Sequence, residues 1–152
     1  MNRKVITFVL IAFAGVALAF AVVPLLGRTT AIASPASYND VFRAIGSIEL
    51  ANLVWNFAVV GLLGAGIAVF LACLLALWVA RTSRFATIAT FVAGFFVGGH
   101  VLTPIYFGQA EYITAVLFGR SWWGYGIELS VLCSAAAAAL VHLRLSRRRS
   151  GL

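Results

Sequence analysis

The stretch LVWNFAVVGLLGAGIAVFLACLLALWVA, residues 53–80, decides the fold, because no charged side chain interrupts it. A helix needs about 20 apolar residues to cross the hydrocarbon core of a bilayer, and this stretch exceeds that length. Three further runs, apolar apart from isolated polar residues, meet the same requirement at residues 5–26, 85–107 and 122–143. Inside lipid a backbone has to satisfy its hydrogen bonds within its own segment, so these runs predict helices and not strands.

The composition is that of a chain dissolved in lipid. Of its 152 residues, 63% are hydrophobic and 10% are charged, against roughly 25% charged in an ordinary soluble domain. We therefore expect one all-α integral membrane domain over residues 1–152, an antiparallel bundle of four transmembrane helices with short amphipathic segments in the two outer loops. The expected spans cover approximately residues 5–26, 50–80, 85–107 and 122–145, followed by a basic tail at residues 144–152.

The basic residues predict the orientation of the bundle. Four spans place both termini on one side, together with Arg3, Lys4, Arg81, Arg84, Arg144, Arg147, Arg148 and Arg149. The other side receives only Arg28, Arg43 and Arg120. Because Lys and Arg collect on the cytoplasmic side, both termini are expected there, in a bacterial-type inner membrane.

The net charge of +7 does not indicate a nucleic-acid partner. The basic run RLSRRR, residues 144–149, directly follows the last span and has no aromatic residues between its cations. Basic residues in that position are typical of membrane anchoring and of contact with anionic lipids. Membrane lipids are therefore the expected partners of this run.

Two readings of the first span stay open. The sequence AIAS, residues 31–34, follows a basic start and an apolar run, so it resembles a signal peptide cleaved after Ala33. The run at residues 5–26 is longer than the usual 7–15-residue signal core, which favours a retained helix.

The two outer loops contain segments that suit the membrane surface. In the first loop, Val41, Phe42, Ile45 and Ile48 fall at helical spacing, with Asn39 or Asp40 as the expected helix cap. In the second loop, YITAVLF at residues 112–118 is too short to cross and too apolar to stay in water. An interfacial or re-entrant segment is expected there.

Two ionisable residues are expected at the same depth in the outer half of the bundle. At 1.5 Å per residue, Glu128 lies roughly 9 Å below the boundary marked by Trp122, and His100 roughly 10 Å below that marked by Phe107. A carboxylate at the bilayer centre costs at least about 2.5–3.5 kcal/mol, so it needs a partner. We expect Glu128 and His100 to face each other.

Further polar residues are expected beside this pair. On the second span Glu49, Asn52 and Asn56 follow one another at offsets of three and four, and Thr103 shares the face of His100. Together with His100 and Glu128 they form the predicted polar cluster. His100 and Glu128 are also the candidate catalytic residues, although the same groups can simply hold helices together.

Small residues mark the faces on which helices are expected to meet. Gly94 and Gly98 form a small-xxx-small motif, which favours close helix contact and is the expected surface for a protein partner or a second copy. Ala135 and Ala139 lie on the face of Glu128.

The sequence contains no motif for a metal or a cofactor. His100 and His142 are expected about 18–20 Å apart in depth, so one chain does not supply both axial ligands of a haem. The spacing of Cys and His does not fit a zinc site. No metal and no cofactor are predicted, and a lipid or a quinone remains open as a ligand.

Three functions remain open from the sequence. The favoured one is a non-catalytic accessory or structural subunit of a larger membrane assembly, which suits short loops and a glycine face. The second is a small transporter or channel in which Glu128 and His100 handle protons or cations. The third is a membrane enzyme that acts on a lipid or a quinone with His100 as base. A pore-forming role is disfavoured because the polar residues cluster in one half of the membrane.

Overall fold

The computed structural model describes residues 2–32, 35–80, 83–113 and 122–150, and all regular secondary structure in these ranges is helical. Within these ranges, four helices are long and apolar enough to cross a membrane, at Arg3–Val22, Ile48–Val79, Arg84–Tyr106 and Gly126–Arg148. The first belongs to α1 (Arg3–Ile32) and the last to α8 (Gly126–Ser150). The other two are composite: the second joins α3 (Ile48–Trp55), η1 (Asn56–Gly66) and α4 (Ile67–Val79), and the third joins α5 (Arg84–Val97), η2 (Gly98–Leu102) and α6 (Thr103–Tyr106).

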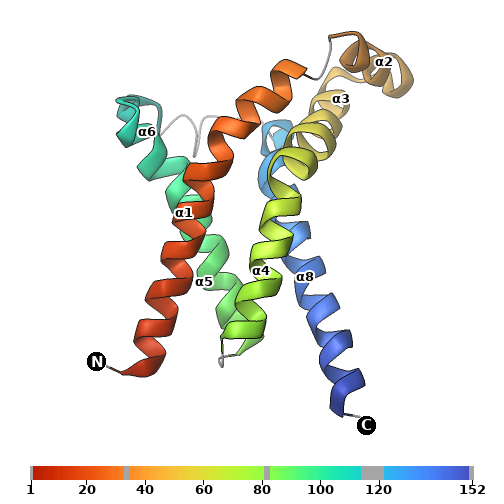
Figure 1. The fold of residues 1–152 in the computed structure, drawn as a ribbon. Coiled ribbons are helices and arrows are strands. Elements are labelled where there is room, and N and C mark those ends of the chain that lie inside the picture. Colours follow the sequence, from red (N-terminus) through yellow and green to blue (C-terminus); the bar gives the residue numbers. More distant parts are fainter. Residues whose placement is uncertain (1, 33–34, 81–82, 114–121, 151–152) are drawn as a thin grey trace.

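The long helices alternate in direction, so both chain termini lie at the same end of the molecule (Figure 1). The most extensive packing is between α1 and α5, and between the η1–α4 segment and α8. We call these the first and the second helix pair. The short elements α2 (Pro35–Ile45), η3 (Ala110–Tyr112) and η4 (Trp122–Tyr125) lie at the end opposite the termini.

Glycine allows the two helices of each pair to approach closely. In the first pair, a Cβ on Gly94 would overlap the carbonyl oxygen of Ala12 and lie 3.0 Å from its Cα, and one on Gly15 would lie 2.8 Å from Phe95 N. In the second pair, a Cβ on Gly61 would lie 2.7 Å from Ser130 Cβ. Without a hydrophobic drive between helices in lipid, such backbone contact is a main source of association.

Two of the spanning helices contain π-helical segments. The N–H of Ile67 at the end of η1 donates to Leu62 O, and that of Thr103 at the end of η2 donates to Gly98 O, so each bond spans five residues. Both segments are rich in glycine, which lowers the preference for the α-helix. A π-turn holds more residues than an α-turn, so it rotates every side chain that follows it.

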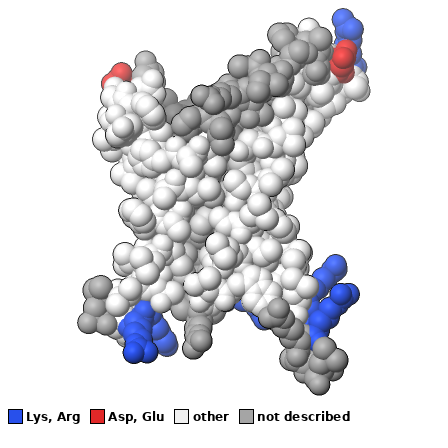
Figure 2. All heavy atoms as spheres, viewed as in Figure 1, with Lys and Arg blue, Asp and Glu red and all other residues white. Residues whose placement is uncertain are grey.

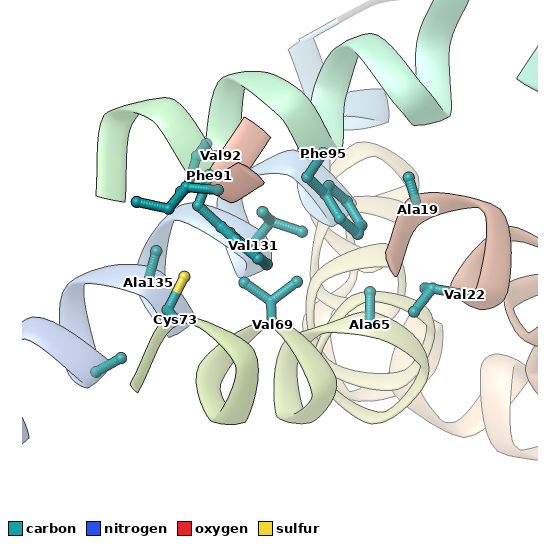
Figure 3. Close-up of a cluster of buried hydrophobic side chains, with 12 residues drawn as sticks. Ala19, Val22, Ala65, Val69, Cys73, Phe91, Val92, Phe95, Val131 and Ala135 are labelled. Carbon is teal, nitrogen blue, oxygen red and sulfur yellow. The ribbon is translucent and has the colours of Figure 1, made fainter. Parts of the chain in front are cut away.

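An apolar core fills the middle of the bundle and joins the two pairs. Figure 3 shows Phe91 and Phe95 of α5 pointing between the helices, toward Val69 of α4 and Val131 of α8. Val69 and Val131 are fully buried. Cys73 belongs to the same core, whereas Cys133 is exposed. Many large apolar side chains of the described residues are exposed, as expected for a chain whose solvent is lipid.

Several expected boundaries are corrected by the structure. α1 continues through Pro24 to Ile32, and Figure 1 shows that it changes direction in this upper part, which fits a proline kink. α2 begins at Pro35, because proline is tolerated in a first turn, so Asn39 and Asp40 lie inside this helix and do not cap it. The basic run after residue 144 is helical and continues α8 as far as Ser150.

Two sequence expectations lie outside the described residues. The expected cleavage position after Ala33 falls in the gap at residues 33–34. Most of the expected interfacial segment in the second outer loop falls in the gap at residues 114–121.

Candidate intramembrane polar site

His100 and Glu128 are in contact across the two helix pairs. His100 lies in η2 of the first pair and Glu128 in the first turn of α8 in the second pair. His100 Nε2 is 3.2 Å from Glu128 Oε1, which is a salt bridge when the imidazole is protonated. The side chains are 22% and 15% exposed. Removing one partner of such an enclosed pair costs more than removing one partner of a surface pair, because the remaining group is left poorly solvated.

The local structure of η2 fixes the His100 ring. The ring is stacked on Phe96, with centroids 5.7 Å apart and planes 19° apart. The π-turn closes around His100, because both the N–H and the hydroxyl of Thr103 donate to Gly98 O, the hydroxyl at 2.7 Å. This arrangement buries Thr103 and leaves His100 facing α8.

The start of α8 lies directly against the second span. A Cβ on Gly126 would lie 2.8 Å from both Asn56 Cβ and Leu53 O, so only glycine fits here. Glu128 follows two residues later and is carried by a helix that cannot shift toward η1. Ser130, which is fully buried, donates to Ile127 O at 2.7 Å in the next turn.

The structure divides the predicted polar cluster. Asn56 is half-buried against α8 at the level of Gly126, two residues before Glu128 in the chain. Asn52 instead accepts a 3.0 Å hydrogen bond from the Tyr38 hydroxyl and so connects α3 to α2. Glu49 is exposed in the first turn of α3 and is not part of the buried contact.

The predicted packing faces are also changed by the π-segments. Val60 is buried whereas Leu63 is 64% exposed, although about 100° per residue puts both on the same stripe as Asn56. Ala89 and Ala93, which the same spacing puts on the face of His100, are exposed. A helical wheel of about 100° per residue does not predict the face on which these residues lie, because the π-segments η1 and η2 interrupt the α-helical geometry. In the regular helix α8, Ala135 is buried and Ala139 half-buried.

Residues of α1 in the same chain cover the glycine motif of the third span. Gly94 lies against Ala12, and Gly98 lies against Val16 and Ala19, all three in α1. A protein partner or a second copy would therefore have to use another surface.

Three contacts were not foreseen from the sequence. Phe96 precedes His100 by four residues, a spacing that could have indicated the stacking. Tyr38 also packs edge-on against Trp55, with centroids 5.5 Å apart, which no local pattern predicts. At the end with the termini, Trp78 packs edge-on against His142 at 5.0 Å.

Within the part of the chain that the structure describes, no group of three or more His, Cys, Asp and Glu side chains could hold a metal ion. Comparison with protein-family models, with curated proteins and with solved structures finds no match for this chain. The fold and the site therefore define the class: an all-helical membrane protein with four helices able to span the bilayer and a His–Glu contact among them.

Proposed function

We propose that the chain is a multi-pass protein of a bacterial-type inner membrane with both termini in the cytoplasm. The charge distribution supports this orientation. The end with the termini carries Arg and Lys, whereas on the face in Figure 2 the acidic residues lie at the opposite end. Lys and Arg near span ends set the orientation in the membrane.

Thiol labelling tests this orientation. Gln109→Cys lies at the end opposite the termini, and Arg148→Cys lies near the end of α8; both positions are exposed. A membrane-impermeant maleimide is expected to label the Gln109→Cys variant in intact spheroplasts. The Arg148→Cys variant is expected to be labelled only after the spheroplasts are permeabilised. The reverse order of labelling would contradict the proposed orientation.

We propose further that the protein is a non-catalytic subunit of a larger membrane assembly and that the His100–Glu128 contact holds its two helix pairs together. The supporting observation is that His100 and Glu128, which come from different helix pairs, are in contact at 3.2 Å. Toward the termini, the space between the pairs is filled by Val69, Phe91 and Val131. Such an apolar core favours a structural role for the contact over a route for ions.

Proton or cation handling is a second candidate function, and two observations favour it. The His100 and Glu128 side chains are 22% and 15% exposed and so are not fully enclosed by the protein. His100 also lies in a π-helical segment, a feature frequent at functional sites. Ionisable residues inside membranes commonly belong to proton relays.

Glu128→Gln separates the two candidates, with Glu111→Gln as a control at an exposed carboxylate of the same end. If the subunit proposal holds, the wild-type protein purified in mild detergent carries other polypeptides at a fixed ratio. The Glu128→Gln variant is then expected to retain at most half of these polypeptides, whereas the Glu111→Gln variant retains them all. The purified chain in liposomes then dissipates a proton gradient no faster than empty liposomes. The subunit proposal would be overturned in favour of proton handling by two results together. The chain would purify without partner polypeptides, and it would dissipate the proton gradient faster than empty liposomes in a way that Glu128→Gln abolishes.

A further inference from the structure

A groove of about 910 Å³ opens between α1 and α4 toward the end with the termini. Its walls are residues of α1 from Arg3 to Ala21 and of the second span from Ala72 to Ala80, with Phe91 of α5 between them. α1 and α4 are the two helices nearest the viewer in Figure 1, with α5 behind them. The volume is within the range of about 300–1,000 Å³ typical of small-molecule sites.

Small side chains keep the groove open. On α1 the wall includes Ala14 and Ala17, and on α4 it includes Ala72 and Ala76. Ala14 and Ala17 are exposed, whereas Phe91 at the base belongs to the buried core. The groove is therefore a stable apolar surface that an occupant can cover without rearranging the helices.

The end of the groove near the N-terminus is cationic. Arg3 and Lys4 both line it, and both are exposed. The described carboxylates of the chain belong to elements near the opposite end: Asp40, Glu49, Glu111 and Glu128. An occupant that matches these walls has an anionic group at Arg3 and Lys4 and an apolar body beyond them.

The groove is long enough for one leaflet. From Thr7 to Ala21, the last α1 residue in its wall, α1 rises about 21 Å, by 1.5 Å for each residue. Half of a hydrocarbon core of about 30 Å is about 15 Å. An acyl chain along this wall therefore reaches the middle of the membrane while its headgroup stays level with Arg3 and Lys4.

A second copy of the chain fits this surface less well. A copy with the same orientation brings its own Arg3 and Lys4 to the same level, so like charges would meet. An anionic lipid brings the opposite charge, and basic residues near a membrane surface each attract such lipids by about 1 kcal/mol.

We propose that this groove is a binding site for one anionic glycerophospholipid, with the phosphate at Arg3 and Lys4 and an acyl chain between α1 and α4. The proposal does not depend on the role of the His100–Glu128 contact or on the presence of a partner assembly.

Native mass spectrometry of delipidated protein in detergent tests the site. Phosphatidylglycerol and phosphatidylcholine with identical acyl chains are titrated separately, and glycerol phosphate is added as a chain-free competitor. We expect one phosphatidylglycerol to bind about thirty-fold more tightly than phosphatidylcholine, the factor that two cations supply. Glycerol phosphate at the same concentration is expected not to displace it.

Matched variants locate the binding. Arg3→Gln with Lys4→Gln is expected to remove the preference for phosphatidylglycerol, whereas Arg144→Gln with Arg148→Gln, which removes two exposed cations of α8, keeps it. Ala17→Phe fills the groove from an exposed position and is expected to weaken both lipids at least ten-fold. The proposal would be overturned if the two lipids bound equally, or if the α8 variant lost the preference for phosphatidylglycerol to the same extent. Unchanged lipid binding in Ala17→Phe, or displacement of the lipid by glycerol phosphate, would also overturn it.

Discussion

Gly94→Ala is expected to destabilise the protein by about 1–3 kcal/mol relative to Gly99→Ala, the range found for overpacked interiors. A Cβ on Gly94 would overlap the backbone carbonyl of Ala12, and backbone cannot move aside as a flexible side chain can. To accept the methyl group, α1 and α5 must separate, which weakens the closest contact of the first helix pair. The free energy of unfolding in mixed detergent micelles, followed by circular dichroism, measures the effect.

Gly99→Ala is the matched control for this prediction. A Cβ on Gly99 would meet only Ala19 Cβ, at 3.9 Å, which is an ordinary contact. Both variants gain helix propensity of up to about 1 kcal/mol, and this gain cancels only in part, because Gly94 lies in α5 and Gly99 in the π-segment η2. Equal stability of the two variants would mean that α1 and α5 are farther apart than described.

Glu128→Ala and His100→Ala are each expected to lower the free energy of unfolding by about 1–3 kcal/mol. Breaking a fully buried ion pair costs about 3–5 kcal/mol and breaking an exposed one about 0–1, and this half-buried contact lies between them. Each variant also leaves the other ionisable group in a poorly solvated place. The loss should concern the docking of the first helix pair on the second, because the contact joins them.

Glu111→Ala is the control, since it removes an exposed carboxylate near the same end of the molecule. Its stability is expected to stay within about 0.5 kcal/mol of the wild-type value. A loss in Glu111→Ala as large as that in Glu128→Ala would mean that net charge, and not the contact with His100, accounts for the effect.

Much of the fold could be predicted from the sequence because the bilayer sets a simple length requirement. Uninterrupted runs such as residues 53–80 indicate spanning helices without knowledge of their neighbours. The ends of the helices were harder to predict. The first span was expected to end at residue 26, yet α1 continues through Pro24 to Ile32, because a proline bends one turn and the flanking residues still favour a helix.

The depth of the polar residues could also be predicted, because rise along a helix is nearly constant. Counting residues put His100 and Glu128 at one level, and the structure has them in contact. Their faces were less predictable. The π-segment η1 rotates the side chains along it, so Leu63 is exposed. The π-segment η2 separates His100 from Ala93, which is exposed, whereas the regular α8 keeps Ala135 on a packed face.

Which helices pack closely against each other could not be predicted from local pattern. The Gly94 and Gly98 motif indicated close packing, but nothing in the sequence distinguished α1 of the same chain from a second molecule as its partner. The hydrogen bond from Tyr38 to Asn52 depends on how α2 folds back over α3. The bend at Gly46, which has φ of +72° and so favours glycine, allows this path.

A double-mutant cycle on His100 and Glu128 tests most directly whether this contact holds the two helix pairs together. The free energies of unfolding of wild type, His100→Ala, Glu128→Ala and the double variant are compared in the same micelles. We predict that the double variant loses at least about 1 kcal/mol less than the sum of the single losses, since each single change already breaks the contact. Losses that add to within about 0.5 kcal/mol would contradict a direct interaction between the two side chains.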